Sequence, residues 1–381
     1  MKPKPAIDAV IAGYTGVDIT PGFPRSLRPV PLSELLRPGK LLQTQGLNIS
    51  LGGVVPNTGL AMQRFGQRVA LQGLVGRDAL GDIVMGLLQQ HGAAAGIRRT
   101  DRAGTAYGIV LAPPGTDRMF LEDPGCNGIF SAKDVDWDTV PRSRLFHFGY
   151  PTLMAAMFAN NGCELQKMFA RTRKHGVATS LDLTLPDPDS PAGKVDWRRL
   201  LAAVLPHTDI FVPSIEEILF MLEPATYARL LARACGGDPV DAIPQDLYRR
   251  LGDQVLSMGV KVLMIKAGHR GAYLRTADVS ALNAATALRL PLASWSGREL
   301  WAAPLPVARA RFRNACGAGD CAVAGFLTAM LEGMTLELAG NCAMQAGRDN
   351  LYGVDALSGL SDWKRMPQAR GAAQRKRDGR R

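Results

Sequence analysis

The sequence lacks the features of a secreted or membrane-bound protein. No apolar run is long enough to span a bilayer. The N-terminus, MKPKPAIDAVIAG, passes directly into a strand-like pattern, without the basic segment and small-residue cleavage site of a signal peptide. These absences predict a cytoplasmic protein without a membrane partner.

Metal-binding and disulfide patterns are also missing. The six cysteines contain no C-x-x-C pair, and no group of His and Cys has the spacing of metal ligands. The sequence therefore suggests neither a zinc site nor a disulfide framework, and reduced cysteines are expected. Cys316 and Cys321 flank a glycine-rich turn, where small buried packing residues are favoured over reactive thiols.

Repeats and the usual dinucleotide signature are absent as well. No internal repeat occurs, and no G-x-G-x-x-G follows the first strand-like segment, which argues against a dehydrogenase. With 381 residues, 46% hydrophobic and 21% charged, the chain is globular and can form one large α/β domain or two smaller ones.

The net charge of +11 is concentrated at the C-terminus. Between Lys364 and Arg381, eight basic residues and one acidic residue give +7, which leaves +4 for the rest of the chain. This segment has few large apolar groups, so residues 364–381 are predicted to form a disordered tail. A solubilising role is favoured over weak contact with nucleic acid or an anionic membrane surface.

Strand-like and helix-like segments alternate along most of the chain. Such alternation predicts a mostly parallel central sheet with helices on both faces and ligands at the carboxyl ends of the strands. The expected strands are residues 6–18, 69–76, 144–150, 177–183, 209–213 and 262–268, and the expected helices include one ending near residue 65, one from 79, 153–176 and 216–222.

Two stretches interrupt the alternation. Residues 39–53 and residues 105–123 each look like a pair of short strands with no long helix between them, the second with a turn at PPGTD. A small β element projecting from the main sheet is expected from both.

The stretch RNACGAGDCAVAGF, residues 313–326, places a glycine turn directly before Asp320 and an apolar helix. Bare backbone at a helix start can approach an anion, because unpaired N–H groups and the positive end of the helix dipole lie there. An ordinary helix cap is the alternative for Asp320.

Four stretches in this order resemble the ribokinase-type (PfkB) carbohydrate kinase family over roughly residues 6–363. The first is GGVVPNTGLAMQRFG with QGLVGRDALGD, and the second is VPSIEE, which resembles a Pro-Asn-x-x-Glu motif. The third is KAGHRG, similar to a Thr-x-Gly-x-x-Gly nucleotide loop, and the fourth is NACGAGDCAVAGF, similar to the C-terminal signature.

The resemblance implies a ribokinase-like kinase domain over residues 1–363. It also implies a β-sheet lid from about 18–51 and 105–123, through which a homodimer could form. The implied activity is transfer of the γ-phosphoryl group of ATP, with Mg²⁺, to a hydroxyl of a sugar or sugar-like molecule. Ribose, fructose or its phosphate, a ketodeoxy sugar acid and a nucleoside all remain compatible acceptors.

Site residues carried over from the family fall into four groups. Asp320 is implied as general base, with the turn of Gly317, Ala318, Gly319 and Asp320 as an anion hole. The implied sugar contacts are Asp18, Gly52, Gly53, Asn57 and Arg118. The implied nucleotide contacts are Lys266, Gly268, Gly271 and Asn314. Glu217 is implied to order water on Mg²⁺, and Asp182 to lie near the phosphate path.

Local alternatives exist for several of these residues. Asp18 could form a turn, Asn57 could cap a helix, and Lys266 could be a solvated loop lysine. Arg118 could be an exposed hairpin residue and Glu217 a surface helix carboxylate.

Three departures from the family pattern keep other functions open. Asn314 replaces the usual Asp, which leaves activation by a monovalent cation undecided, and Ser214 and Lys266 replace the usual Asn and Thr. A non-catalytic sugar or nucleotide sensor of the same fold and a nucleoside kinase are the alternative functions.

Overall fold

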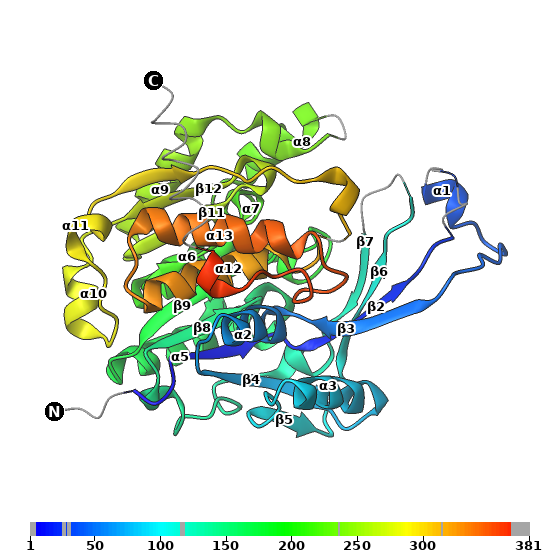
Figure 1. Cartoon of the computed structure of the whole chain (residues 1–381), viewed down its shortest axis with the longest axis horizontal. Coiled ribbons are helices and arrows are strands. Elements are labelled where there is room, and N and C mark those ends of the chain that lie inside the picture. The colour runs from blue at the N-terminus through cyan, green and yellow to red at the C-terminus, as the bar shows by residue number, and fades with distance from the viewer. Residues whose placement is uncertain are drawn as a thin grey trace.

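The computed structural model describes residues 5–24, 28, 32–114, 119–234, 237–313 and 315–366. In this part of the chain a nine-stranded sheet has the order β13-β12-β11-β10-β9-β8-β1-β4-β5 (Figure 1). Neighbours from β11 to β5 are parallel, whereas β12 and β13 add antiparallel at one edge. The predicted, mostly parallel sheet is therefore confirmed. Its strands are β1 (Ala9–Gly13), β4 (Val69–Gly76), β5 (Ile97–Thr100), β8 (Leu145–Gly149), β9 (Ala178–Asp182), β10 (Ile210–Phe211), β11 (Val262–Lys266), β12 (Ala272–Thr276) and β13 (Glu299–Ala302).

Helices form two groups around this sheet (Figure 1). One group packs together as α2 (Val54–Arg64), α12 (Ala318–Leu331) and α13 (Leu336–Asn350). The other includes α5 (Cys163–Lys174) against β9 and α9 (Gln245–Ser257) against β11, with α6 (Trp197–Val204), α7 (Ile215–Leu222) and α8 (Pro224–Ala234) beside them. The remaining helices are α1 (Leu32–Leu35), α3 (Ala79–Gln90), α4 (Ala155–Phe158), α10 (Ser280–Ala285) and α11 (Leu292–Trp295).

The helix predicted over residues 153–176 is broken in the structure. Short turns and α4 occupy residues 151–162, and the continuous helix α5 begins only at Cys163. Asn160 and Asn161 have left-handed backbone conformations, with φ of 50° and 55°, which a right-handed helix cannot include. Helical periodicity alone did not reveal this interruption.

A second sheet, called the small sheet below, has the order β3-β2-β6-β7. It consists of β2 (Gly16–Pro21), β3 (Leu47–Gly52), β6 (Ala106–Leu111) and β7 (Met119–Asp123). The pairs β2–β3 and β6–β7 are antiparallel, and β2 and β6 join them in parallel. Three of these strands, β3, β6 and β7, lie within the two segments expected to form a projecting β element, whereas β2 does not.

Two boundaries in this region were predicted wrongly. Residues 39–53 contain one strand, β3, because its antiparallel partner is β2 and not the exposed segment around Leu41. The strand predicted over residues 6–18 is two strands in different sheets, with Gly13 at φ 125° at the end of the first. Asp18 therefore lies inside β2 and not at the end of the first strand.

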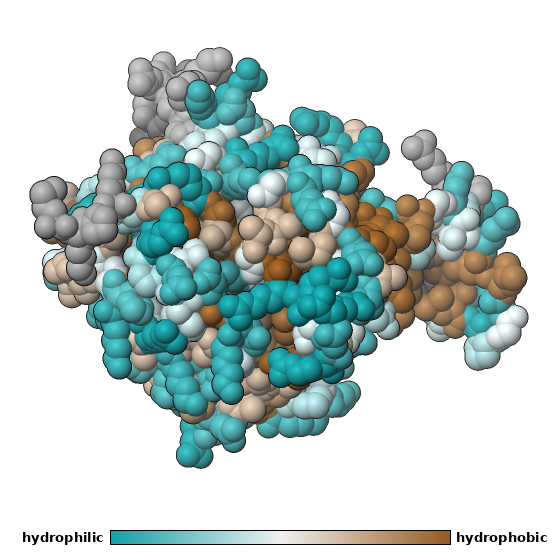
Figure 2. Space-filling model, turned by 90° about the horizontal axis from the view of Figure 1, so that it is seen from below, coloured by the Kyte–Doolittle hydropathy of each residue, from teal (hydrophilic) through white to brown (hydrophobic). Residues whose placement is uncertain are grey.

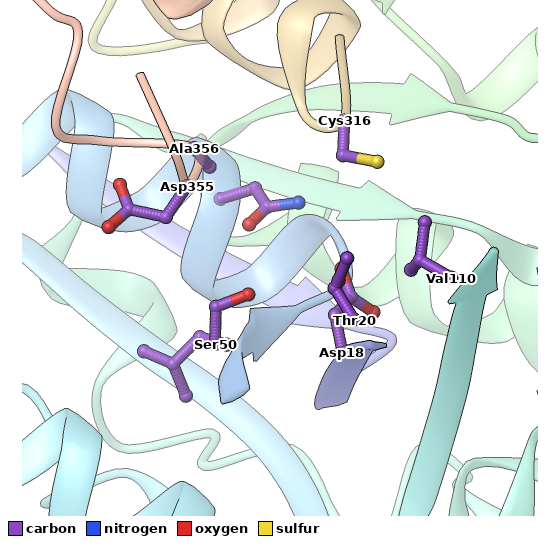
Figure 3. Close-up of a pocket in the computed structure, with 9 residues that line it drawn as sticks. Asp18, Thr20, Ser50, Val110, Cys316, Asp355 and Ala356 are labelled. Carbon is purple, nitrogen blue, oxygen red and sulfur yellow. The ribbon is translucent and has the colours of Figure 1, made fainter. Parts of the chain in front are cut away.

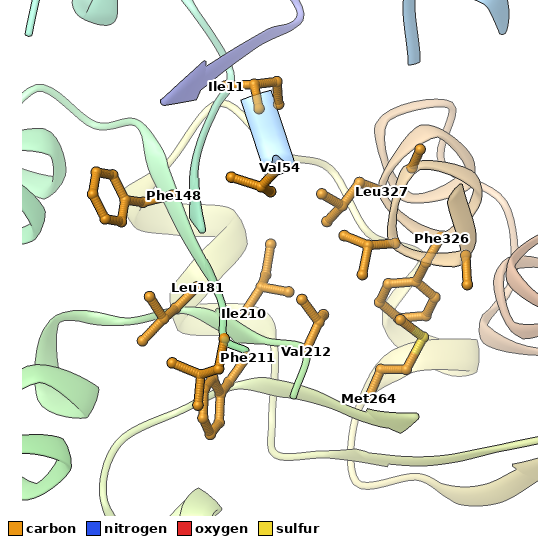
Figure 4. Close-up of a cluster of buried hydrophobic side chains, with 14 of the residues drawn as sticks. Ile11, Val54, Phe148, Leu181, Ile210, Phe211, Val212, Met264, Phe326 and Leu327 are labelled. Carbon is orange, nitrogen blue, oxygen red and sulfur yellow. The ribbon is translucent and has the colours of Figure 1, made fainter. Parts of the chain in front are cut away.

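The core lies between the large sheet and its helices. Figure 4 shows side chains of the strands, such as Ile11 and Met264, directed toward the same interior as Phe326 of α12. Every residue of α12 from Asp320 to Leu331 is buried. A helix that is apolar on all sides is held by packing, so its first turn is fixed against the ends of the strands.

The structured chain continues slightly further than predicted. A 3₁₀ turn covers Trp363–Arg365 and Met366 is buried, although a tail was expected from Lys364. The rest of the predicted tail, residues 367–381, lies outside the described residues. Within the described ranges, every helix is too short or too polar to cross a membrane.

Candidate active site

Asp320 is the centre of a group of polar residues at the carboxyl edge of the large sheet. Its carboxylate accepts hydrogen bonds from Tyr150 Oη at 2.7 Å and from Asn57 Nδ2 at 2.9 Å. The residue is 3% exposed. Burial raises the pKa of Asp320, while the two hydrogen bonds and the charge of Lys266 act in the opposite direction. The carboxylate does not cap its own helix, since Gly317 is the N-cap, and the capping alternative is wrong.

Tyr150 is a site residue that sequence reasoning missed. It follows β8 directly and has a left-handed backbone, with φ of 63°. This is an uncommon conformation for a bulky residue and often marks a functional position. The conformation turns the hydroxyl toward Asp320, so Tyr150 orients one carboxylate oxygen. Its place at the carboxyl end of a parallel strand is the signal that could have identified it.

A buried ion pair lies beside this carboxylate. Lys266, the last residue of β11, places Nζ 2.6 Å from Oδ1 of Asp182, the last residue of β9. Burial by itself would lower the pKa of Lys266, but the charges of Asp182 and Glu217 raise it, which favours the ammonium form. Burial raises the pKa of Asp182, against the effect of Lys266. The alternative of a solvated loop lysine is therefore wrong.

Glu217 lies in the first turn of α7 and is only 8% exposed. It forms a capping box with Ser214: Glu217 Oε2 accepts from the Ser214 amide at 2.6 Å, and Ser214 Oγ accepts from the Glu217 amide at 3.2 Å. The interpretation as an exposed surface carboxylate is thus wrong. The serine that departs from the family pattern has a clear local role as an N-cap.

The start of α12 lies beside Lys266 and has free backbone donors. In the described part of the chain, the amides of Gly319 and Asp320 have no hydrogen-bond acceptor, whereas Ala318 donates to Ala315 O at 3.3 Å. A Cβ added at Gly319 would lie 3.9 Å from Lys266 Nζ. An ammonium group and two free amides at the positive end of a helix therefore surround one small region. The Ala318 amide, expected in the anion hole, is already bonded.

The predicted nucleotide loop forms a 3₁₀ turn at Gly268–Arg270 directly after β11. A side chain added at Gly268 would meet no described atom within 4 Å. Bare backbone is thus open to solvent one turn away from Lys266. Gly271 follows with φ of 101° and returns the chain into β12.

The small sheet supplies the other wall of the site. Figure 3 shows a pocket in which Asp18, Thr20 and Ser50 face Cys316 and Asp355. Asn57, in the first turn of α2, also lines it and donates to Asp320. Its interpretation as a helix cap is wrong, because the N-cap is Gly53.

Gly53 allows the small sheet and α2 to meet. It has φ of 93°, and an added Cβ would lie 2.6 Å from the carbonyl oxygen of Tyr14. Gly52 similarly leaves room for Asp18, whose Oδ1 would be 2.3 Å from a Cβ at that position. The glycine pair therefore shapes the wall that holds Asp18.

Carboxylates gather on this wall. Burial, Glu122 and Asp320 raise the pKa of Asp18 to about 7. Burial raises the pKa of Glu122 to about 6, although its hydrogen bond from the Tyr14 hydroxyl opposes the shift. Glu122, Cys316 and Asp355 line or border this wall but were not predicted as site residues. Cys316 lies within the fourth motif, where it was interpreted as a packing residue, and Glu122 and Asp355 lie outside the four motifs.

Two predicted site residues, Arg118 and Asn314, lie outside the described residues. Among the described ones, no three His, Cys, Asp or Glu side chains are arranged to hold a metal ion. Asp182 Oδ2 is buried and without a hydrogen-bond partner in the same part of the chain. Oxygen ligands of this kind fit Mg²⁺ that keeps most of its water and arrives with a nucleotide.

Comparisons with known proteins identify the family of this chain. Residues 27–348 match the model of the pfkB family carbohydrate kinase. An uncharacterized sugar kinase of Archaeoglobus fulgidus is 22% identical over 283 residues, which cover 74% of this chain and 90% of its own. A probable fructokinase-4 of Arabidopsis thaliana is 25% identical over 173 residues, 45% of this chain and 52% of its own.

Solved structures show the same fold. The ribokinase of Arabidopsis thaliana complexed with ribose and ATP superposes with a TM-score of 0.67 at 17% identity, over 95% of this chain and 98% of that one. A putative ribokinase II from E. coli in complex with ATP and Mg²⁺ gives 0.67 at 20% identity, with the same coverage. The ribokinase-like fold expected from the sequence is therefore confirmed.

Proposed function

The chain belongs to the pfkB family of carbohydrate kinases, and on that premise we propose that its acceptor binds between the small sheet and Asp320 while ATP approaches from the turn after β11. It is a phosphotransferase with an alcohol group as acceptor. The observation that carries the proposal is the buried Asp320 carboxylate, which accepts hydrogen bonds from Tyr150 and from Asn57, a residue that lines the pocket.

Asp320 acts as the general base. An acceptor hydroxyl is a weak nucleophile, and a carboxylate within hydrogen-bonding reach can remove its proton as the bond to phosphorus forms. The raised pKa of Asp320 makes it a stronger base than an exposed aspartate. The two hydrogen bonds restrict its orientation, so the proton acceptor points in one direction.

Lys266 and the start of α12 stabilise the transferred phosphoryl group. Charge spreads over the phosphoryl oxygens in the transition state, and fixed donors in a buried site stabilise it without reorganisation. The amides of Gly319 and Asp320 and the Lys266 ammonium supply such donors. The phosphoryl oxygens would replace part of the contact between the Lys266 ammonium group and Asp182. The ammonium group would then pair with the phosphoryl group as well as with the carboxylate.

Mg²⁺ would neutralise charge on the nucleotide phosphates. Asp182, through its unpartnered Oδ2, is the residue best placed to receive it, with Glu217 close by. The remaining nucleotide contacts are assigned to the turn from Gly268 to Gly271, and Asn314 and Arg118 keep the roles that the family resemblance implies.

A turnover screen tests the proposed function. The purified chain with ATP and Mg²⁺ should consume ATP with one class of acceptor from a panel of pentoses, hexoses, sugar phosphates, sugar acids and nucleosides. Mass spectrometry of the product should show one added phosphoryl group. Binding of these compounds without any turnover would favour the sensor alternative instead.

A homodimer through the small sheet is part of the proposal. Ile49, Ile19, Ile109 and Leu121 lie opposite one another in register across its four strands. Leu47, Ile49 and Leu121 are 59%, 38% and 49% exposed, and Figure 2 shows hydrophobic residues gathered over this projecting region. Exposed apolar surface of this kind favours association.

Light scattering tests the homodimer. The wild-type chain should have twice the mass of its 40.9 kDa chain, and Ile49→Lys with Leu121→Lys should lower it to the single-chain value. Leu292→Lys, at a 48% exposed leucine of α11, is the matched control and should stay dimeric. A wild-type mass of one chain would contradict the proposal.

A further inference from the structure

The inner face of the small sheet carries a row of polar residues in register. Ser50 of β3 pairs with Asp18 of β2, Asp18 with Gly108 of β6, and Gly108 with Glu122 of β7. Residues opposite one another in neighbouring strands project from the same face of a sheet. Three oxygen-bearing side chains and one bare glycine therefore lie along a single line.

Gly108 leaves a notch between two carboxylates. A Cβ at this position would lie 2.6 Å from Glu122 Oε2 and 3.3 Å from Asp18 Oδ1. Both oxygens thus border the same small space, which any side chain other than hydrogen would fill. The Tyr14 hydroxyl donates to the other oxygen of Glu122 and fixes the side chain in this position.

Carboxyl groups are concentrated in this part of the site. Asp18 and Asp355 both line the acceptor pocket, and Asp320 lies near enough to raise the pKa of Asp18. Within the described ranges, neither Asp18 nor Glu122 forms an ion pair with Lys or Arg, and no cationic side chain lines the pocket. Asp355 is satisfied by the amides of Leu357 and Ser358, whereas Asp18 has no described donor.

We propose that Glu122 is a second acceptor-binding carboxylate and that, with Asp18, it restricts the acceptor to neutral or cationic polyhydroxyl compounds. Hydroxyl groups of a polyol donate hydrogen bonds to both carboxylates, and charge-assisted hydrogen bonds of this type are strong. A carboxylate or phosphate on the acceptor would add negative charge beside unpaired carboxylates, and like charges brought together at an interface weaken binding. The proposal rests on the proposed kinase function and names the substrate class of the same site.

Calorimetric binding to matched compounds tests this inference. The probes are a ketohexose and its 6-phosphate, an aldopentose and its aldonic acid, and a hexose with its 2-amino derivative. They are titrated into the full chain with a non-hydrolysable ATP analogue and Mg²⁺. The neutral member of the first two pairs should bind at least about tenfold more tightly than the anionic member. The amino sugar should bind at least as tightly as the hexose.

Variants show whether Glu122 sets this preference. Glu122→Gln should weaken binding of the neutral sugar and reduce the neutral-to-anionic ratio by about tenfold. Gly108→Ala should weaken every acceptor, because it fills the notch. Glu34→Gln, at a glutamate of α1 with a 3.9 Å contact to Arg37, is the matched control and should leave the ratio unchanged.

Two results would overturn the inference. One is tighter binding of the anionic member, with that advantage lost in Arg118→Ala. The other is a neutral-to-anionic ratio that Glu122→Gln leaves unaltered. The binding readout separates these failures from failure of the kinase function, which would appear as absent turnover whatever the order of affinities.

Discussion

Replacing Asp320 by asparagine should lower kcat by about 10³- to 10⁴-fold, because the acceptor hydroxyl loses its proton acceptor. The amide has nearly the same shape and can still accept the hydrogen bond from Tyr150. KM values should therefore change much less than kcat. Steady-state kinetics with the best acceptor measures both, and Asp101→Asn, at an aspartate whose side chain is 78% exposed, is the control.

The same substitution should not destabilise the fold at high pH. The pKa of Asp320 in the folded chain is raised above its unfolded value. A carboxyl group of this kind favours the folded state below its unfolded pKa, and this contribution is lost as the pH rises through the folded pKa. Asparagine removes the buried charge, so its thermal midpoint at pH 8 should equal or exceed that of the wild type. A large fall in that midpoint would indicate a structural role.

Tyr150 gives a further check on the base. In the pH profile of kcat/KM, the apparent pKa on the acid side should lie above the ordinary pKa of an aspartate, because Asp320 must be deprotonated to act. The Tyr150 hydroxyl opposes the raised pKa, so Tyr150→Phe should move this apparent pKa to a higher value. An apparent pKa that stays in place would show that Asp320 is not the titrating group.

Replacing Lys266 by methionine should affect both stability and catalysis. Asp182 would be left as a fully buried carboxylate without its cation, and breaking such a pair typically costs about 3–5 kcal/mol. The transferred phosphoryl group would also lose a charged donor, which should lower kcat by about 10²- to 10³-fold. Chemical denaturation and steady-state kinetics measure the two effects separately.

A double variant distinguishes the two roles of Lys266. Lys266→Met with Asp182→Asn removes the unpaired buried charge, so stability should return toward wild type while activity stays low. Lys167→Met, at a 62% exposed lysine, is the control for loss of a surface ion pair. Full activity in the single variant would show that Lys266 does not contact the phosphoryl group. Lys266→Thr introduces the residue usual in the family and tests whether the position requires a cation.

The local sequence was sufficient to identify Asp320 as a candidate site residue and to predict the class of the fold. Asp320 follows a glycine turn and precedes an apolar helix, and both features are readable within fourteen residues. The alternation of strands and helices likewise predicts a parallel sheet, because each element needs only its own periodicity. The prediction of a helix over 153–176 was wrong because it also used periodicity alone. The left-handed conformations of Asn160 and Asn161 interrupt the helix without changing the spacing of apolar residues.

Contacts between distant segments could not be predicted in this way. Asn57 and Tyr150 donate hydrogen bonds to Asp320, from which they are 263 and 170 positions away in the sequence. Lys266 is 84 positions away from its partner Asp182. The motifs indicated Asn57, Lys266 and Asp320 separately. They did not indicate that Asn57 would donate a hydrogen bond to Asp320 or that Lys266 would be buried. Tyr150 lies in none of the motifs and depends on a left-handed backbone conformation, so only its place after a parallel strand indicated it.

The sequence by itself identified an α/β fold of the carbohydrate kinase family and placed Asp320, the base that we propose, at the start of one buried helix. The tertiary structure alone decided which side chains surround Asp320 and which carboxyl groups line the nearby pocket. Strand register sets Asp18, Gly108 and Glu122 in one row, and a shift of one residue would turn each to the other face. Register and loop geometry arise from the packing of the whole chain, whereas helices and strands arise from their own residues.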